Sequence, residues 1–543
     1  MQPSQFWYKN AIFYQVNVRA FYDSSGDGHG DFEGVTEKLD YLKNLGVDCL
    51  WLMPFYNSPL NDDGYDISDF YRVLPAFGTI EQLKILVESA HEKGLRIITD
   101  MIMNHTSDQH PWFQSARSGP ESPFHDYYVW SDTDKKYEDA RIIFVDTEKS
   151  NWTWDVQAQQ YYWHRFYASQ PDLNYQNPDV QNAMLDVMKF WLEIGIDGFR
   201  ADAIPYLFER EGTNCENLPE THAFLKDIRS FIDNDYPGCI LLAEANQWPK
   251  DVLPYFGDGD EFQMGFHFPL MPRIFMALKK ADRTSLVWIL NETPPIPDNC
   301  QWCTFLRNHD ELTLEMVTEE ERQYMWQQYA PDPKMRMNLG IRRRLAPLLD
   351  NDARKIRLAN ALLYGLPGSP IIYYGDEIGM GDNIDLFDRN GVRTPLQWTS
   401  GKNAGFSTAP AEKLYEPVIA KPPFDPDSVN VQDQLANHDS LYHFMKKLVL
   451  VRKENPVLAE GSLLWLDPAE KALLACLRSL NGVTVLVLNN LSDQPRTVSI
   501  QHADLQGTPL DLWTNQPEPQ FKDGRIDLTL EPYQFIWLKY EGK

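Results

Sequence analysis

Two neighbouring segments decide the fold class: Thr79-Ile80-Glu81-Gln82-Leu83-Lys84-Ile85-Leu86-Val87-Glu88-Ser89-Ala90-His91-Glu92-Lys93 and, after Gly94, Leu95-Arg96-Ile97-Ile98-Thr99-Asp100. The first carries apolar residues at helical spacing, and Thr79 with Glu81 and Gln82 is typical of a helix start. The second is a short β-branched run that ends on a carboxylate. Together they predict a helix that leads into a buried strand, the repeating unit of α/β folds.

The same alternation continues along the chain. Residues 177–194 carry a second helical pattern, and short apolar runs that indicate strands occur at residues 11–16, 48–52, 95–100, 195–200, 239–244, weakly near Phe262, 304–306 and 370–374. Eight strands that alternate with helices predict an α/β fold, a parallel (β/α)8 TIM barrel, whose C-terminal face is available for chemistry.

Several segments interrupt or follow this alternation. Residues 104–176 are rich in Trp, Tyr, Asp and Ser, which predicts a loop-rich domain inserted after strand three. Residues 311–345 are charged and helical, and we expect Arg342-Arg343-Arg344 within them to form a solvated helix face. Residues 381–435 form a connection rich in Pro, Gly and Asn that we expect to shape a site.

From about residue 456 the pattern changes to short alternating runs, at residues 463–465, 473–478, 483–488, 497–500 and 535–540. These predict an antiparallel β module. We therefore expect a catalytic barrel of residues 1–103 and 177–455, an inserted domain of residues 104–176 and a C-terminal β-sandwich of residues 456–543.

Composition narrows the classes of partner. The 543 residues hold 50 Lys and Arg against 78 Asp and Glu, a net charge of −28. Such an excess repels nucleic acid backbones and anionic lipid, so neither is an expected partner. The six cysteines are few and scattered, residues 1–9 lack the pattern of a signal peptide, and no apolar run is long enough to span a membrane. We therefore expect a cytoplasmic enzyme, for which a homo-oligomer is possible. The pair Cys300-x-x-Cys303 has no second cysteine pair or histidine pair beside it, and so it is a poor candidate for a metal or redox site.

Carboxylates stand at the ends of three predicted strands, where barrel enzymes keep their catalytic groups. Arg200 and Asp202 are two apart and so face the same side of one strand. Glu244 ends the fifth strand, and Asp310 follows His309 after the seventh. We expect Arg200 to keep Asp202 ionised as a nucleophile, and burial near another carboxylate to raise the pKa of Glu244 so that it acts as acid and base.

Four motifs carry a resemblance to a family: Asp100-Met101-Ile102-Met103-Asn104-His105, Gly198-Phe199-Arg200-Ala201-Asp202, Ala243-Glu244-Ala245 and Asn308-His309-Asp310. They resemble the signature regions of glycoside hydrolase family 13, the α-amylase family, in family order. The resemblance implies a barrel with an inserted B domain and a C-terminal β domain. It makes Asp202 the nucleophile, Glu244 the general acid/base and Asp310 the transition-state stabiliser, with Arg200, His105 and His309 holding the nucleophile and sugar hydroxyls.

Other stretches resemble members that act on short α-glucosides. There Tyr65 would stack under the glucose, and Asp62 would pair with Arg393 to close the pocket floor. Residues 140–148, 205–213 and 309–315 resemble the trehalose synthase subgroup, which isomerises maltose to trehalose with minor hydrolysis to glucose. That resemblance implies that Arg141, Asn246 and Glu311 close over the acceptor glucose, and it places Phe144 among the substrate residues.

One or two structural calcium sites are expected, and no catalytic cofactor. Carboxylates alternate in one loop, whose candidate ligands are Asp23, Ser25, Asp27, His29 and Asp31. The trehalose synthase resemblance implies a second site formed by Asn104, Asp172, Tyr206, Leu207 and Glu209.

The sequence leaves alternative activities open. A hydrolase of the same architecture, an α-glucosidase or oligo-1,6-glucosidase, is the nearest. A sucrose isomerase or amylosucrase comes next, and a non-catalytic barrel relative is the most remote. The expected ligands are small sugars: maltose, trehalose and glucose.

Overall fold

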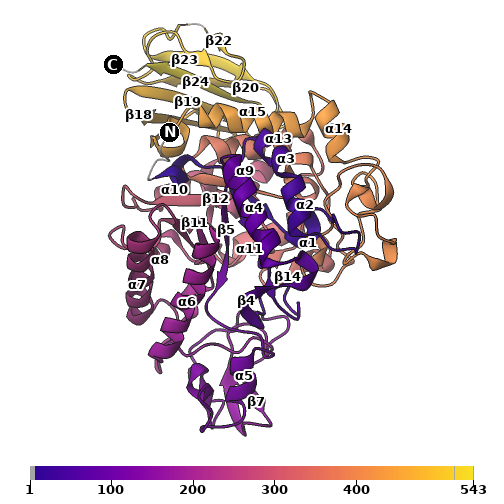
Figure 1. Cartoon of the computed structure of the whole chain (residues 1–543). Coiled ribbons are helices and arrows are strands. Elements are labelled where there is room, and N and C mark those ends of the chain that lie inside the picture. The colour runs from indigo at the N-terminus through magenta and orange to yellow at the C-terminus, as the bar shows by residue number, and fades with distance from the viewer. Residues whose placement is uncertain (1–5, 519, 542–543) are drawn as a thin grey trace.

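Eight parallel strands close into a barrel at the centre of the molecule (Figure 1). The computed structural model describes residues 6–518 and 520–541, so residues 1–5, part of the segment compared with a signal peptide, lie outside it. The strand order is β1-β16-β12-β11-β10-β9-β5-β2. Their bounds are β1 Phe13–Val16, β2 Cys49–Leu52, β5 Arg96–Ile102, β9 Gly198–Asp202, β10 Ile240–Ala243, β11 Met264–Phe266, β12 Gln301–Phe305 and β16 Ser369–Tyr373. The predicted barrel is confirmed, including the weak sixth strand.

Helices cover the outside of the barrel. The longer ones are α2 Phe32–Glu37, α3 Leu39–Leu45, α4 Ile80–Glu92, α6 Pro178–Ile194, α7 Pro219–Asp235, α9 Leu270–Lys280, α10 Thr284–Asn291, α13 Ala353–Gly365 and α15 Leu441–Lys453. Thr79 and Gln82 form the capping box that starts α4. Gly195 ends α6 in the left-handed region at φ 109°, and for this reason β9 begins three residues after the predicted start of the fourth strand.

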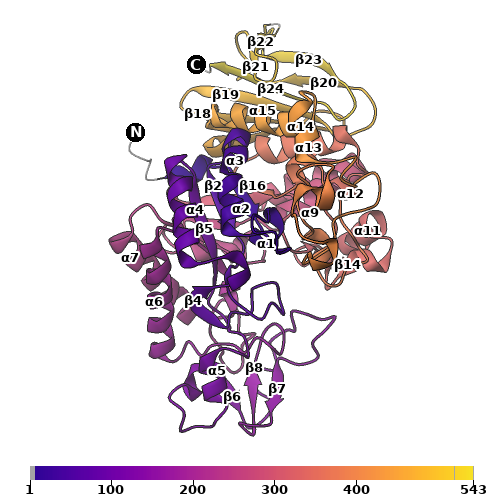
Figure 2. The ribbon, with the colours of Figure 1, turned by 45° about the vertical axis from the view of Figure 1, so that its right-hand side comes forward.

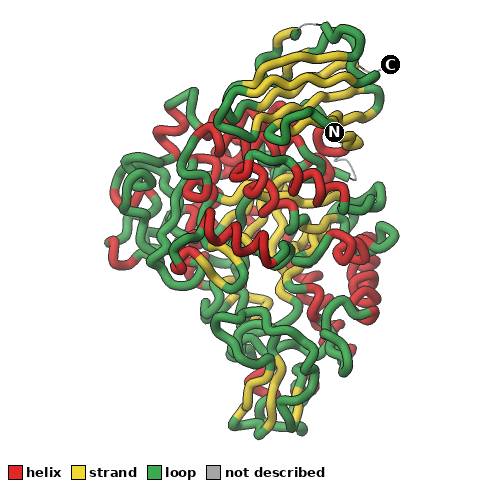
Figure 3. Tube along the Cα trace, turned by 180° about the vertical axis from the view of Figure 1, so that it is seen from behind, coloured by secondary structure: helices red, strands yellow, loops and turns green. Residues whose placement is uncertain are grey.

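The loop-rich segment after β5 lies at the end of the molecule opposite the C-terminal sheets (Figures 1 and 3). It contains α5 Pro111–Ala116 and an antiparallel sheet, β6-β8-β7, with bounds β6 Trp130–Ser131, β7 Trp152–Asp155 and β8 Gln160–Trp163. A small hairpin, β3 Tyr56–Asn57 with β4 Asp69–Val73, precedes it in the chain. Trp152 and Trp163 pack edge to face at 5.0 Å in a separate apolar cluster, whereas Phe113, Tyr128 and Tyr162 join the main core.

The insertion after β12 is only partly helical. It holds α11 Glu319–Tyr329 and a three-stranded sheet of β13 Leu312–Thr313, β14 Arg336–Met337 and β15 Gly340–Ile341, in the order β13-β15-β14. In Figure 2, α11 and β14 project beside the barrel, above the loops of the inserted domain.

The prediction that Arg342, Arg343 and Arg344 form a solvated helix face is wrong. The three residues follow β15 without helical structure. Arg343 Nε pairs with Asp382 at 2.9 Å, and Arg344 is fully buried and donates to the Tyr374 carbonyl at 2.7 Å. These arginines therefore bind partners that are distant in the sequence, which a local charge pattern does not reveal.

Two antiparallel sheets form the C-terminal module. The larger has the order β17-β18-β19-β24-β21-β22, with bounds β17 Ser462–Leu466, β18 Leu473–Leu480, β19 Val483–Asn490, β21 Leu510–Asp511, β22 Gln516–Pro517 and β24 Phe535–Glu541. The smaller pairs β20 Arg496–Gln501 with β23 Arg525–Leu530. An apolar cluster of both sheets lies between them, as in a sandwich. Buried Arg478 donates to the carbonyls of Gly365 and Leu458 and so ties the module to the barrel.

No helix in the described part of the chain combines the length and apolar character needed to cross a bilayer. The six cysteines are all free thiols, and Cys300 and Cys303 are both buried.

Candidate active site

Three carboxylates from three strand ends line one cavity. Asp202 is the last residue of β9, Glu244 follows β10 directly, and Asp310 follows β12. The cavity that they line has a volume of about 140 Å³. The side chains therefore meet at the end of the barrel where such enzymes carry out chemistry.

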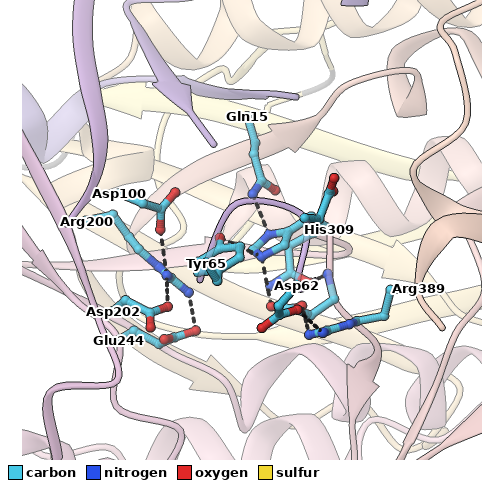
Figure 4. A network of polar contacts seen from close by, with 12 residues as sticks. Gln15, Asp62, Tyr65, Asp100, Arg200, Asp202, Glu244, His309 and Arg389 are labelled. Atoms are coloured by element: carbon cyan, nitrogen blue, oxygen red, sulfur yellow. Dashed lines mark hydrogen bonds and ion pairs between the residues drawn. The ribbon is translucent and has the colours of Figure 1, made fainter. Parts of the chain in front are cut away.

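Arg200 binds three carboxylates at once (Figure 4). Its Nη1 donates to Asp100 Oδ1 at 2.6 Å and to Asp202 Oδ1, and its Nη2 donates to Glu244 Oε1. Trp51 Nε1 donates to the other oxygen of Asp100 at 2.6 Å. Because one planar guanidinium holds both Asp202 and Glu244, these two carboxyl groups lie close together in a fixed orientation.

His309 is held between a barrel strand and the third carboxylate. Gln15 Nε2 donates to His309 Nδ1 at 2.6 Å, so the ring proton resides on Nε2. That nitrogen lies 3.0 Å from Asp310 Oδ2 and 2.8 Å from the Tyr65 hydroxyl. The Tyr65 ring stacks on the His309 ring at 5.3 Å, and His105 Nε2 donates to the Tyr65 carbonyl at 3.1 Å. These contacts fix the orientation of the tyrosine ring in the cavity wall.

Two arginines anchor Asp310 at one end of the cavity. Arg389 Nη1 and Arg393 Nη2 lie 2.8 and 3.1 Å from Asp310 Oδ1. The predicted pairing of Asp62 with Arg393 is wrong: Asp62 pairs with Arg389 at 2.6 Å, whereas Arg393 binds Asp63 at 3.2 Å. The exchange arises because both arginines follow β16 in one irregular loop, where sequence spacing does not define which one reaches Asp62.

The three carboxylates ionise differently. Burial raises the pKa of Asp202 to about 6, whereas Arg200 acts to lower it, as expected, so that Asp202 is still ionised at neutral pH. Burial, together with Asp202 and Asp310, raises the pKa of Glu244 to about 8. Burial works against ionisation of Asp310, but His309 and Arg389 hold its pKa well below the usual range. Near neutral pH, one of these three groups is therefore protonated and the other two are carboxylates.

The remaining wall of the cavity combines rings with polar groups. Its other lining residues are Asp62, Tyr65, His105, Ile143, Phe144, Phe166, Ala203, Pro205, Tyr206, Asn246, Phe268, Asn308, His309, Glu311, Thr313, Glu315 and Arg389. Flat apolar faces beside hydroxyl-binding groups are suited to sugar rings. Of the predicted substrate residues, Arg141, Arg200 and Arg393 are not among the lining residues, but each binds a carboxylate that is.

A second ionic network borders the part of the cavity that Asn246 and Glu315 line, where the sequence predicts the acceptor glucose. Arg141 Nη1 pairs with Glu315 at 3.0 Å, and its Nε pairs with Glu216 at 2.8 Å. Asn246 Nδ2 donates to the same Glu315 oxygen at 3.1 Å. Arg141 comes from the inserted domain and Glu315 from the segment after Asp310. The network therefore joins two walls of the cavity.

The loop of residues 23–31 closes on itself through hydrogen bonds. Asp31 caps α2 through the Gly34 amide, and the other oxygen of Asp31 accepts the amides of Ser24 and Ser25. Asp23 accepts the amides of Gly26 and Gly28. Since these carboxylates already have donors, the loop offers a cation few free oxygens, and a metal held by Asp23, Ser25, Asp27, His29 and Asp31 stays a prediction from sequence.

The second predicted metal site has a different chemistry. Asn104 Oδ1, Asp172 Oδ2 and both carboxylate oxygens of Glu209 are buried without a donor among the described residues. Burial raises the pKa of Asp172 to about 8, and burial with Asp172 raises that of Glu209 well above its usual range. Unpaired acceptor oxygens that repel one another fit a hard cation. The structure contains no group of three His, Cys, Asp or Glu within the described ranges, so such a cation would also need amide and carbonyl ligands.

Sequence reasoning missed two residues with central positions. Arg389 bridges Asp62 and Asp310, and Glu315 bridges Arg141 and Asn246. Both lie in segments already singled out, the connection after strand eight and the motif that follows Asp310. The signal that could have identified them is a charged residue within a few positions of a predicted site residue.

Comparison with known proteins identifies the family. Residues 15–332 and 341–461 match the model described as alpha amylase, catalytic domain, and residues 463–537 match that of the maltogenic amylase C-terminal domain. The chain is 57% identical to trehalose synthase/amylase TreS of Mycobacterium tuberculosis over 98% of its own length and 90% of the relative's. It is 53% identical to the trehalose synthase of Pimelobacter sp. (strain R48), over 98% and 96%.

A solved structure shows the same arrangement. Trehalulose synthase MutB from Pseudomonas mesoacidophila MX-45 has a TM-score of 0.78 and 27% identity, over 98% of this chain and 99% of that one. The alpha-amylase model extends over the barrel and its strand-end carboxylates, and the close relatives extend over the C-terminal sheets as well. The chain belongs to the α-amylase family.

Proposed function

We propose that this chain is a trehalose synthase, which converts maltose to trehalose reversibly by cutting and rejoining one glycosidic bond inside a closed pocket. The observation that carries the proposal is the single guanidinium of Arg200 that holds Asp202 and Glu244 side by side in a cavity with ion pairs at both ends. The relatives named trehalose synthase, 53–57% identical over nearly the whole chain, support it.

The first step forms a covalent intermediate. Asp202 attacks the anomeric carbon of the non-reducing glucose through Oδ2, since Arg200 holds Oδ1. Glu244, protonated because of its raised pKa, gives its proton to the departing glycosidic oxygen. Retaining enzymes need the two carboxyl groups roughly 5–5.5 Å apart, an arrangement that one bridging guanidinium favours. The negative charge of Asp310 stabilises the positive charge that develops on the ring.

The second step reverses the roles. The freed glucose turns within the pocket, and its anomeric hydroxyl attacks the glucosyl ester while Glu244 takes the proton and Asp202 leaves. Two inversions restore the α configuration, so the product is the α,α-linked disaccharide. Water that enters during this interval gives glucose instead, so closure of the pocket determines the product.

The donor end admits one glucose. Asp62, Arg389 and Asp310 are linked by contacts of 2.6 and 2.8 Å, and Gln170 Nε2 donates to Asp62 at 3.0 Å. This group closes the end of the cavity and presents charged side chains to the terminal sugar hydroxyls. A disaccharide therefore fits better than the middle of a starch chain.

Incubation of the pure protein with maltose tests the proposal. We expect trehalose as the main product and glucose as a minor one, measured by chromatography and by the anomeric proton signals in NMR. Trehalose as substrate should give maltose. Mostly glucose with no trehalose from either sugar would overturn the isomerase assignment in favour of an α-glucosidase.

We also propose a structural calcium ion. Asn104, Asp172, Glu209 and the carbonyls of Tyr206 and Leu207 would hold it, and its charge would satisfy the buried oxygens described above. Metal analysis of the purified protein should give about one calcium per chain, and chelation should lower the melting temperature. Glu209→Gln should lose the metal and the sensitivity to chelator, whereas a wild-type protein without calcium and unaffected by chelation would contradict the site.

The remaining expectations concern the setting of the enzyme. Small sugars are its proposed ligands, and the net charge of −28 argues against nucleic acid and anionic membrane surfaces. We propose a cytoplasmic location because the six cysteines are free thiols.

A further inference from the structure

A short hairpin lies across the boundary between two walls of the cavity. Its strands are β14 and β15, and β15 also pairs with β13, which begins two residues after Asp310. Gly340 approaches Glu311 so closely that a Cβ atom would lie 2.5 Å from Glu311 Cγ. The hairpin therefore packs directly on the segment that carries the third carboxylate.

Asn338, at the turn of this hairpin, contacts both walls. Its backbone N–H donates to Asp146 Oδ2 at 2.7 Å, and its side-chain Nδ2 donates to Glu311 Oε1 at 3.2 Å. Glu311 lines the cavity, and Asp146 follows two cavity residues, Ile143 and Phe144, in the inserted domain. One residue thus connects the inserted domain to the wall beside the catalytic carboxylates, and we call these two hydrogen bonds the Asn338 clasp.

The two sides of the hairpin are held with unequal strength. Arg342, just after β15, donates to the carbonyls of Ile384, Leu386 and Asp388, in the loop that also carries Arg389. On the other side, the one hydrogen bond between the hairpin and the inserted domain among the described residues is that to Asp146, an exposed carboxylate. Because solvent competes for exposed hydrogen bonds, the side toward the inserted domain opens more easily.

Asn338 lies in a segment that the alpha-amylase family model does not match. The alpha-amylase model matches residues up to 332 and again from 341, so it leaves out the turn that contains Asn338. Figure 2 places β14 above the loops of the inserted domain, consistent with the Asp146 contact. The hairpin is therefore a place where this chain can differ in outcome from other enzymes with the same carboxylates.

We propose that Asn338 and Asp146 are positioning residues that set how the glucosyl intermediate divides between rejoining and hydrolysis. When the clasp opens, a water molecule reaches the anomeric carbon. Its oxygen bonds to that carbon, the ester bond to Asp202 breaks, and its proton passes to Glu244. When the clasp is closed, the captive glucose is the only nucleophile at that carbon. The inference rests on the proposed function, because it concerns the fate of the same intermediate.

Two variants test the clasp separately. Asp146→Ala removes the acceptor on the inserted domain, and Asn338→Gly removes the bond to Glu311 while tolerating the positive φ of 46° at this turn. The matched control is Asp139→Ala, an exposed carboxylate of the same domain with no described role in the cavity. Each protein is incubated with maltose, and glucose and trehalose are measured at early times beside the melting temperature.

We expect each clasp variant to raise the glucose-to-trehalose ratio about threefold to tenfold, the effect of losing one hydrogen bond, with maltose consumption and melting temperature nearly unchanged. The control should keep the wild-type ratio. Wild-type ratios in both clasp variants would overturn the inference alone. A wild-type protein that makes no trehalose would overturn the proposed function, and the inference with it.

Discussion

The two ends of the cavity are built from ion pairs of different character. At the donor end, the Arg389 and Asp62 side chains are 8% and 7% exposed, and both are tied to further charged groups. At the acceptor end, Arg141 is 38% exposed and its partner Glu315 16%. A desolvated pair is costly to break and fixes one geometry, whereas a partly hydrated pair opens and closes at little cost. One end is suited to holding a sugar, and the other to releasing one.

The largest effect should come from the centre that both ends share. Asp202→Ala removes the proposed nucleophile, and we expect kcat to fall at least about 10⁴-fold, as for other covalent catalysts. The melting temperature should stay close to that of the wild type, because Arg200 retains Asp100 and Glu244. Near-wild-type turnover in this variant would exclude Asp202 as the nucleophile.

The next largest effect should come from the donor end. Arg389→Met removes the ion-pair partner of buried Asp62 and one of the two arginines that bind Asp310. We therefore expect kcat/KM for maltose to fall at least about 100-fold. The ratio of glucose to trehalose should change little, since the acceptor end is intact. Arg354→Met, which breaks an exposed pair with Asp352, is the control. A loss of only a few-fold would show that the buried pair does not hold the sugar.

The sequence predicts the barrel because each strand is a short apolar run, and the carboxylates that matter stand directly at strand ends. It does not predict which arginine reaches Asp62, because Arg389 and Arg393 share an irregular loop. It also fails to predict the burial of Arg344, which binds the Tyr374 carbonyl and lies over the rings of Tyr373 and Tyr374. Both failures concern long-range pairing of charged residues in loops, where no periodicity identifies the partner.

In the C-terminal module, by contrast, one strand was missed although the sequence does indicate it. Strand β23 has the pattern Arg525-Ile526-Asp527-Leu528-Thr529-Leu530, with apolar residues at every second position, and this alternation alone indicates a strand. It was not predicted, so the signal existed and the interpretation missed it. The two-residue strands β21 and β22, by contrast, are too short to leave a period in the sequence.

The pH dependence of kcat/KM should depend on Asp202 and Glu244 at the centre of the cavity, and not on the ion pairs at its two ends. Asp202 must be ionised to attack and Glu244 protonated to donate, so kcat/KM should fall below about pH 6 and above about pH 8. Beyond each limit we expect about a tenfold loss per pH unit. Asp310, with its pKa well below the usual range, stays charged throughout. Glu244→Gln should remove the alkaline limb, and an alkaline limb that persists in this variant would assign it to another group.

The smallest change in rate should come from the acceptor end, where the change in product is most informative. Arg141→Met removes the pairs with Glu315 and Glu216 but leaves the donor end intact. Because these pairs are partly hydrated, we expect maltose consumption to fall by only about threefold to tenfold. The glucose share should rise, since the freed glucose escapes and water enters. Arg389→Met should show the reverse, a large loss of rate with little change in product. If both variants change rate and product alike, the two ends do not differ in the way that their burial indicates.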